Sequence, residues 1–430
     1  MRLFTPWTKT VLLTLGSFML LIPAVAQAQG QTNKGFVRQL FFQGVVDPQE
    51  SPALVQQIAN ESADEIAKFV AAAISTAPVV SSSAGFTYVR DQDTGELSLR
   101  SQSFGPSFAE RPLTNGKGVG SFGVSYQHSR TTFDGAFGTA DGKDEGLPVF
   151  DNTATFTSDR FVQYITKRAF LETQSDTFNF LGAYGVTDRF DIGVSVPFIS
   201  MKVEGRTEEA YDLTRAWNAN EFDRALRPTP TGVLLIEPTT SLDAKGIGDV
   251  TLHLKYAIVN AGSDGVAVNA DVRLPTGDED EFLGTGEASL KILFSASKTQ
   301  ANVLSFHANG GYTVGGLTDE INYVAGVDAA LNQLTASFSF LGRTLRQASL
   351  PSRVPTARRT VSGIAGPRDI VVDRFIWSEE QLSLLQVAAG VKVHLGGNFL
   401  LNAGVLVPVN ERGFQAGVTP AIGIERSWGQ

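Results

Sequence analysis

Residues 184–198, YGVTDRFDIGVSVPF, combine a tight turn with a strand whose side chains alternate in polarity. After the turn at Thr187 and Asp188, the apolar residues are Phe190, Ile192, Val194, Val196 and Phe198, and Asp191, Gly193 and Ser195 lie between them. Successive side chains of a β-strand point to opposite faces, so this strand has one apolar and one polar face. The same alternation recurs over residues 250–258, 266–274, 290–296, 304–312 and 385–395. The chain is therefore predicted to form a sheet that is apolar on one side.

The connections between these segments alternate between short and long. Short ones lie at residues 187–188, 260–263, 298–301, 331–333 and 396–398, and long ones at 131–165, 205–246 and 345–380. Outer-membrane barrels have tight turns on the periplasmic side and longer loops outside, whereas a soluble β-sandwich has no reason to sort its loops in this way. The sequence has no apolar run long enough for a membrane-spanning helix. These features predict an all-β protein, an antiparallel transmembrane β-barrel.

We expect about twelve barrel strands. They are residues 119–130, 166–186, 188–204, 248–259, 265–274, 286–297, 302–314, 321–331, 334–344, 382–395, 399–407 and 414–428. The segment 166–186 is long enough for two strands, so a barrel of fourteen is the alternative. An even number places both ends of the barrel in the periplasm, as in bacterial single-chain barrels.

The first residues predict a secreted protein. Residues 1–28 have Arg2 and Lys9 before an apolar stretch of about a dozen residues, followed by Ala26-Gln27-Ala28, and this is the pattern of a cleaved signal peptide. Its removal takes the formal net charge from −9 to −11, because it removes two basic residues and no acidic one. The acidic balance argues against nucleic-acid binding, and the absence of cysteine excludes disulfides and thiol chemistry. The expected location is the bacterial outer membrane.

Residues 29–118 differ from the barrel that follows at 119–430. Residues 48–76 have apolar side chains at helical spacing, and residues 86–90 and 96–100 predict a hairpin that turns at Asp93-Thr94-Gly95. Two interpretations fit this helix and hairpin. The segment either folds into the lumen as a plug or forms a lid at the periplasmic mouth.

Several short motifs resemble one family. They are residues 103–118, Tyr184–Val194 with the sequence YGVTDRFDIGV, Gly246-Ile247-Gly248-Asp249-Val250, Leu274-Pro275-Thr276-Gly277-Asp278 and Gly417-Val418-Thr419-Pro420. The sequence is similar over residues 82–430 to the outer-membrane barrel family linked to the meta-pathway of phenol degradation. The resemblance implies the barrel fold and passive inward passage of aromatic or other small hydrophobic compounds. It supplies no catalytic residues.

The polar face of the strands should line the lumen. The candidate lumen residues are Asp191, His253, Lys255, Asp271, Arg273, Glu287, Lys291, His307, Asp328, Arg343, Lys392 and Glu425, with His394 as a third histidine. Acids and bases balance, which favours a mixed-charge pore over an ion-selective one. The alternative is that these groups pair across neighbouring strands and hold a narrow barrel shut, for example Lys255 with Asp271 or Arg273 nearby.

Other polar motifs carry weaker hypotheses. Residues 278–281, DEDE, could bind a divalent cation that bridges lipopolysaccharide, and the basic loop 345–380, flanked by Arg343, could contact lipid A phosphates through Arg346, Arg353, Arg358, Arg359 and Arg368. The three histidines have no metal-ligand spacing, so no metal and no cofactor are expected. Phe306-His307-Ala308 is similar to the histidine segment of outer-membrane phospholipase, but Ala308 stands where a nucleophilic serine is expected, and no Gly-x-Ser-x-Gly elbow occurs. The sequence therefore does not predict an enzyme.

Small residues bear on whether the lumen is open. Glycines fall at inward positions (Gly193, Gly326, Gly390, Gly404, Gly417 and Gly423) and could leave room for passage or relieve strand curvature. Pro197 and Pro420 remove ladder donors, which could open a lateral path to the bilayer or mark a bulge near a strand end.

The expected function is an outer-membrane channel for passive uptake of small hydrophobic or aromatic compounds. The alternative is a structural or closed barrel without transport. An outer-membrane lipase or esterase is a third hypothesis, which the sequence favours much less than the other two. Expected partners are outer-membrane lipid and lipopolysaccharide, the barrel-assembly machinery and a small solute, with no nucleic acid. Trp428 near the end of the sequence is the kind of terminal aromatic residue that this machinery prefers.

Overall fold

The computed structural model describes residues 31–42, 64, 68, 85–90, 97–99, 101–132, 147–156, 162–212, 233–236, 239–316, 318–363, 366–410 and 416–429. The predicted signal peptide lies outside these residues, as does the predicted helix 48–76 apart from the helical residues Asp64 and Lys68. One helix, α2 (Asn33–Phe42), precedes the predicted helix. No helix in the described part of the chain has the length and apolar character needed to span a membrane.

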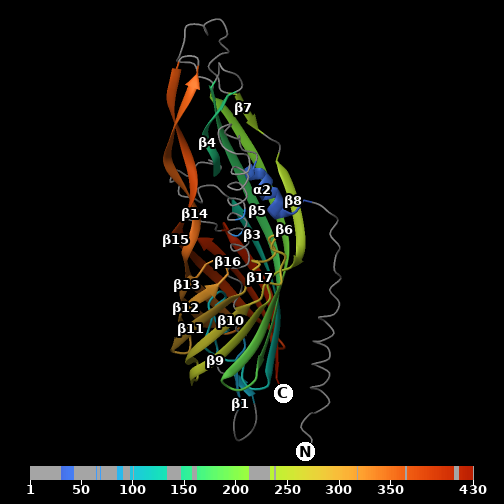
Figure 1. Cartoon of the computed structure of the whole chain (residues 1–430). Coiled ribbons are helices and arrows are strands. Elements are labelled where there is room, and N and C mark those ends of the chain that lie inside the picture. Colours follow the sequence, from blue (N-terminus) through green and yellow to red (C-terminus); the bar gives the residue numbers. More distant parts are fainter. Residues whose placement is uncertain are drawn as a thin grey trace, which may run out of the picture. The chain divides into compact units, whose positions relative to one another are not determined.

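Twelve antiparallel strands of the described chain close into a barrel (Figure 1). Their bounds are β3 (Val119–Thr132), β5 (Val162–Gly185), β6 (Phe190–Asp212), β9 (Thr251–Ala261), β10 (Asp264–Arg273), β11 (Ser289–Gln300), β12 (Leu304–Gly315), β13 (Glu320–Leu331), β14 (Leu334–Gly363), β15 (Gly366–Gly396), β16 (Phe399–Pro408) and β17 (Thr419–Gly429). Each pairs with its neighbours, β5 with β6, and β17 closes against β3 from Ala421↔Gln127 to Gly429↔Val119. The predicted twelve-stranded barrel is confirmed, and 166–186 lies within one strand, β5.

The predicted long loops are partly strands. Residues 345–363 and 366–380 form the outer parts of β14 and β15, which stay paired up to Gly363↔Gly366. Likewise, β5 and β6 extend their pairing to Tyr164↔Asp212. Further strands lie in the other two connections, β4 (Leu147–Phe156) beside β5, and β7 (Val233–Ile236) and β8 (Thr240–Ile247) beside β6. A transmembrane strand needs only about 9–11 residues, so β14 and β15 continue well beyond the bilayer. The predicted long connection at 345–380 is thus an extension of the β14–β15 hairpin in its described residues.

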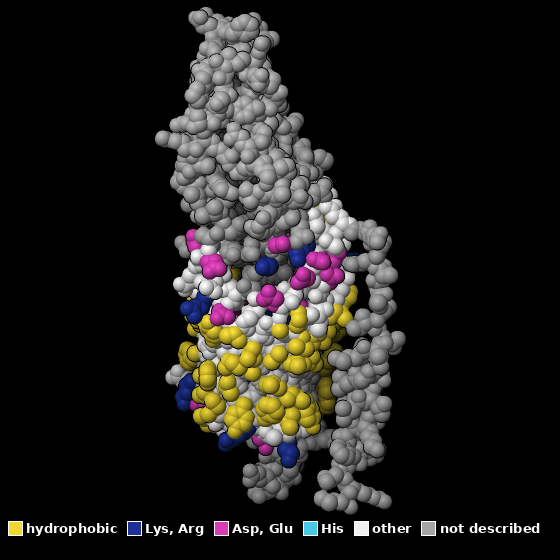
Figure 2. Space-filling model, in the orientation of Figure 1, with side chains coloured by type: hydrophobic (Ala, Val, Ile, Leu, Met, Phe, Trp, Pro, Cys, Tyr) yellow, Lys and Arg dark blue, Asp and Glu magenta, His cyan; other side chains and the backbone are white. Residues whose placement is uncertain are grey.

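The outward face of the strands is apolar over a continuous belt, which Figure 2 shows as a yellow zone on the visible side. The belt includes Phe122, Phe178, Phe180, Ile192, Phe198, Leu252, Leu254, Phe294, Phe306, Phe338, Ile422 and Ile424, all of them exposed. Inward neighbours such as Asp191, Ser195 and Asn309 are buried. Large exposed apolar side chains around a closed sheet match a lipid environment, because water would make this surface costly.

The barrel wall has an irregularity at Pro197. Strand β6 pairs with β9 up to Ser195↔Thr251 and with β8 from Phe198↔Ile247, and the Pro197 carbonyl accepts a hydrogen bond from Gly248 N. Proline lacks the N–H that a continuous ladder would need, so it fits at this change of partner. Beyond it, the buried face of β6 changes from polar residues to Ile199, Met201 and Val203. Pro420 is the second residue of β17, which agrees with a strand-end position.

Candidate functional site

Residues 101–118, here named the inner segment, make hydrogen bonds with inward-facing side chains of the barrel. Ser103 Oγ donates to Asp328, Phe104 N to Thr335 Oγ1 (3.0 Å), Ser107 Oγ to Asn402 Oδ1 (2.9 Å), Glu110 N to Asn309 Oδ1 (3.0 Å) and Asn115 N to Asp191 Oδ2 (2.8 Å). These partners lie on β14, β16, β12, β6 and β13. Polar lumen residues thus hold the protein's own chain.

Two of the inward glycines are explained by this segment. A Cβ atom on Gly390 would lie 2.7 Å from Ser107 Cβ, and one on Gly404 would lie 2.6 Å from the Phe108 ring. Phe108 packs against Leu341, Ala388, Leu406 and Ala421. The room that glycine leaves at these positions is therefore filled by the inner segment, rather than left open as one interpretation of the sequence suggested.

The charged lumen candidates on β9, β10 and β11 form one cluster. Asp271 lies opposite both His253 and Lys291 in the ladder, and its carboxylate contacts His253 Nδ1 at 2.8 Å and Lys291 Nζ at 2.6 Å. In this contact Nδ1 is the donor, because a carboxylate can only accept. Lys255 contacts Glu110 of the inner segment at 3.2 Å, a partner that the sequence did not predict.

A second cluster joins three neighbouring strands. Ser297 Oγ lies 2.7 Å from His307 Nδ1, His307 Nε2 contacts Asp328, and the other oxygen of Asp328 accepts the Ser103 hydroxyl. Ser297, His307 and Asp328 come together because their strands, β11, β12 and β13, are neighbours in the sheet. Both Asp328 oxygens and the His307 ring are buried and engaged, which makes this row an anchor for the inner segment.

A third group surrounds the hairpin β1 (Tyr88–Arg90) and β2 (Leu97–Leu99), which precedes the inner segment. Glu425 accepts two bonds from Gly85 N, at 3.0 and 3.2 Å, and Lys392 Nζ donates to Phe104 O at 3.2 Å. His394 packs its ring against Phe86 and Phe104. Burial and then the Glu425 carboxylate raise the pKa of Tyr88, so its hydroxyl stays neutral at physiological pH.

The remaining lumen candidates lie towards the extracellular ends of the strands. Arg343 Nη1 is 3.8 Å from Glu320 Oε1, and Arg273 is half-buried at the end of β10. Glu287 is exposed and precedes β11, so it does not lie with the buried residues. Among the described residues, no group of three His, Asp or Glu side chains could hold a metal ion.

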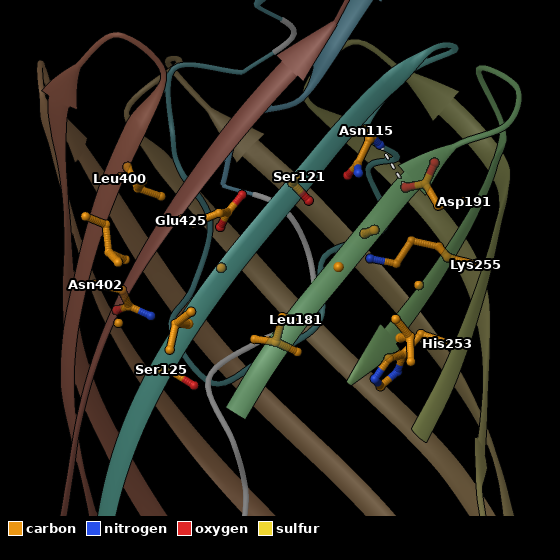
Figure 3. A pocket seen from close by; sticks show the side chains of 18 of the residues that line it. Asn115, Ser121, Ser125, Leu181, Asp191, His253, Lys255, Leu400, Asn402 and Glu425 are labelled. Atoms are coloured by element: carbon orange, nitrogen blue, oxygen red, sulfur yellow. Dashed lines mark hydrogen bonds between the residues drawn. The ribbon is translucent and has the colours of Figure 1, made fainter. Parts of the chain in front are cut away.

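A cavity of about 60 Å³ lies between the inner segment and the wall made by β3, β5, β6, β9, β15, β16 and β17 (Figure 3). Its polar lining includes Asn115, Asp191, His253, Lys255, Lys392, Asn402 and Glu425. Two acids and two lysines balance in charge. Sequence analysis missed Asn115 and Asn402, which are neutral; for Asn402, the inward position in an alternating strand was the available signal.

Two of the family-like motifs meet outside the lumen. Asp249 is buried, and its carboxylate accepts bonds from Gly277 N (3.1 Å), Thr285 N (2.9 Å) and Thr285 Oγ1 (2.8 Å). Thr276 Oγ1 donates to Gly248 O at 2.8 Å. The Gly246–Val250 motif thus shapes the loop 274–288 that carries the Leu274–Asp278 motif.

The acidic turn 278–281 contacts α2. Lys34 Nζ lies 3.3 Å from Glu279 Oε1 and 3.4 Å from Asp280 Oδ1, and Asn33 N donates to Glu281 Oε2. These carboxylates therefore already face a cation and an N–H donor of the chain, which weakens the hypothesis of a divalent-cation site. The side chains of the basic residues Arg353, Arg358, Arg359 and Arg368 lie outside the described part.

Among solved structures, three similar chains are outer-membrane proteins, each with a TM-score below 0.5. An outer-membrane channel from Pseudomonas putida F1 is 12% identical, with a TM-score of 0.40, over 74% of this chain and 99% of that chain. A toluene transporter from Ralstonia pickettii is 14% identical (TM-score 0.28, 74% and 92%), and one from P. putida is 10% identical (TM-score 0.31, 75% and 93%). No curated protein matches the chain in sequence.

The closed barrel of twelve strands, its apolar belt and its polar interior make this an outer-membrane protein. Residues 181–346, from the end of β5 into β14, match the family described as the MetA-pathway of phenol degradation. This match covers less than half of the sequence and includes both motifs that Asp249 joins. Over residues 181–346 the chain is therefore similar to the outer-membrane barrel family linked to phenol degradation, which its motifs also resemble.

Proposed function

We propose that the protein is an outer-membrane channel for passive uptake of small hydrophobic or aromatic compounds, and that the inner segment is a plug that must move for passage. The observation that supports this most is that residues 103–115 of the inner segment bond to inward-facing side chains of five barrel strands. A cavity of about 150 Å³ is known to hold benzene, and the cavity beside the inner segment has only about 60 Å³. An aromatic ring therefore passes only if the plug shifts.

The contacts of the inner segment are compatible with movement. Several of its bonds to the barrel are neutral hydrogen bonds, such as Phe104 N to Thr335 Oγ1 at 3.0 Å and Ser107 N to Ser337 Oγ at 3.3 Å, and others are charged, such as Lys255 with Glu110 at 3.2 Å. Each neutral bond contributes only about 0.5–1.5 kcal/mol net, because water replaces the lost partner on opening. The ion pairs that hold the wall together, such as Asp271 with Lys291, lie between strands and can stay formed while the plug moves.

The alternative is a closed barrel without transport. Cross-strand pairs around Asp271 and the buried row at His307 would then lock the wall, and the inner segment would be permanent core. The two proposals differ in solute flux, because a permanent core passes neither an aromatic compound nor a sugar.

The test is uptake by liposomes that contain the refolded protein. A phenolic compound kept ionised, so that it does not cross lipid unaided, is compared with a sugar of similar size. Faster uptake of the phenolic than into protein-free liposomes supports the channel. Uptake of neither compound, with the barrel folded, favours the closed barrel.

We also propose lipopolysaccharide as the lipid partner on the outer side. Just above the belt, the outward faces of β3, β6 and β8 carry Arg130, Lys202, Arg206 and Lys245. Glu172 holds Arg130 through two bonds of 2.5 and 2.6 Å, and Glu204 holds Lys202 at 2.5 Å. Such oriented cations suit phosphate groups of lipid A. Assembly by the barrel-assembly machinery is likewise a proposal, with Trp428 of β17 as the terminal aromatic residue.

A further inference from the structure

The first turn of α2 is fastened to the acidic turn 278–281. Asn33 N donates to Glu281 Oε2 at 3.2 Å, and Asn33 Nδ2 donates to Glu281 O at 3.1 Å. Lys34 N donates to Asp280 O at 2.9 Å, and Lys34 Nζ lies 3.3 Å from Glu279 Oε1 and 3.4 Å from Asp280 Oδ1. The first two residues of the helix are therefore held by hydrogen bonds and by ion pairs at once.

This contact lies at the extracellular end of the barrel. The loop 274–288, which contains the acidic turn, joins β10 to β11 at the end opposite the short turns 262–263 and 301–303. Short turns mark the periplasmic side of such barrels. The inner segment, in contrast, bonds to Asp191, just after the short turn 187–188. Two segments that precede the barrel in the chain thus reach it near opposite ends.

An apolar side of α2 covers the inner wall at the extracellular end. The helix contacts β6 and β8, and its residues Phe36 and Val37 are 5% and 0% exposed. Gly246 of β8 faces inward, and a Cβ on it would lie 2.8 Å from Leu283 Cδ1, so the loop beside the acidic turn lies over the same wall. The inward residues of β6 in this part are apolar and buried as well; they are Ile199, Met201 and Val203. Burial of this apolar surface favours the docked helix.

The acidic turn is fixed to the wall, so α2 is the part that can leave. The buried carboxylate of Asp249 accepts bonds from Gly277 N at 3.1 Å and from Thr285 N at 2.9 Å, on either side of the turn. Phe282 is fully buried and has a φ of 60°. A bulky residue keeps this backbone conformation only where its surroundings hold it. The turn therefore forms a fixed receiver for the first residues of α2.

The ion pairs make this contact sensitive to salt. The side chains of Glu279 and Asp280 are 53% and 57% exposed, and that of Lys34 is 19% exposed. Exposed charges lose their attraction as salt rises, because the screening length falls from about 10 Å at 0.1 M to about 3 Å at 1 M. We propose that α2 is a releasable latch, which closes the extracellular end of the lumen and opens more readily as ionic strength rises.

Release of α2 can be measured without any solute. The chain has no cysteine, so Val37→Cys supplies a single thiol at a position that is buried while the helix is docked. The rate at which a maleimide labels this thiol, in the full-length protein in lipid nanodiscs, measures release. Labelling should rise roughly 2- to 5-fold between about 0.05 M and about 0.5 M NaCl. Adding Lys34→Gln should remove this salt dependence, and Lys34→Glu should reverse it, because salt then screens a repulsion between the introduced carboxylate and the acidic turn.

Lys298→Glu is the matched control, because Lys298 pairs with Asp264 at 2.7 Å at the opposite rim. It should leave the labelling of Val37→Cys and its salt dependence unchanged. Lys34→Glu combined with Glu279→Lys should slow labelling towards the wild-type rate, which separates a lost ion pair from a misfolded helix. A salt dependence that is the same with Lys, Gln and Glu at position 34, or a failure of this rescue, overturns the latch.

The barrier role of α2 rests on the proposed function and is tested by uptake. Lys34→Gln adds no negative charge that would repel the ionised phenolic, and it should raise liposome uptake of that compound by roughly 2- to 5-fold at low salt. Combined with Gly404→Ala, which crowds Phe108 of the inner segment, the two increases should multiply, because the closures lie in series. Faster labelling without faster uptake, in protein that Gly404→Ala opens, overturns the barrier role. If labelling responds as expected but no variant takes up the phenolic, the channel proposal fails and release of the latch stands.

Discussion

The substitution Gly404→Ala should open the barrel by displacing the plug. The new Cβ would lie 2.6 Å from Phe108 Cε2 and 3.1 Å from Phe108 Cζ, whereas carbon atoms in contact are normally about 3.5–4.0 Å apart. The backbone of β16 is fixed by pairing with β15 and β17. The Phe108 ring must therefore move, and it carries the inner segment with it.

The size of the effect follows from the contacts that Phe108 and its neighbour lose. Withdrawing a buried phenylalanine costs about 1.5–3 kcal/mol. The adjacent Ser107 makes hydrogen bonds to Ser337 and Asn402, which contribute about 1 kcal/mol each. Weakening of the docked state by about 3–5 kcal/mol raises the displaced fraction by roughly two to three and a half orders of magnitude.

The assay is uptake of the ionised phenolic by liposomes, with Gly404→Ala compared with wild type. The control is Gly310→Ala on β12, because a Cβ there meets nothing within 4 Å. Gly390→Ala, directed at Ser107 instead of Phe108, should act like Gly404→Ala. If Gly404→Ala folds normally and takes up the phenolic at the wild-type rate, the inner segment is not the barrier and the plug proposal fails.

Three further predictions concern the wall, the loop and the lipid contact. Phe294→Arg places a charge in the lipid-facing belt and should lower the free energy of unfolding in vesicles by about 2–4 kcal/mol; a smaller loss than that of an extracellular surface variant would contradict the membrane position of the belt. Asp249→Ala removes three hydrogen bonds and should make the loop 274–288 cleavable by protease, which unchanged protection would exclude. The double variant Arg130→Gln and Lys202→Gln should retain less lipopolysaccharide on purification than Lys298→Gln at the opposite rim, and equal retention would argue against the proposed contact.

The wall of the barrel could be predicted because its signal is local. Phe190, Ile192 and Val194 alternate with polar residues, and this period alone fixes which side faces lipid. The sequence did not predict the extension of β14, because Pro351 and Pro355 lack the backbone N–H that a regular strand donates to its neighbour. In the structure, pairing continues past them, with a register shift between Val354 and Ala357. An outer hairpin tolerates such missing donors better than a membrane-embedded strand does.

The contents of the lumen could be predicted only in part. Strand parity identified Asp271 and Asp328 as inward, but not their partners. Lys255 binds Glu110, which precedes the barrel and has no periodic pattern that would locate it inside. A contact between a strand and an irregular segment depends on tertiary packing, which composition and spacing do not encode. For the same reason, the sequence could not show that Gly404 leaves room for the Phe108 ring, because that contact appears only in the structure.

Closure of the barrel at β3 and β17 has a consequence for how the protein assembles. Val119 pairs with Gly429, so the two sides of the seam are separated by nearly the whole barrel sequence. Bringing such distant strands together is slow, because a long loop must be ordered first. If the inner segment docks earlier through Ser107 on Asn402, which already closes a loop of 295 residues, the loop that remains for the seam is about 40 instead of about 310 residues, and the entropic cost of that last step falls by about 2 kcal/mol. The inner segment, which we propose as the plug, would then also guide the first strand to the last.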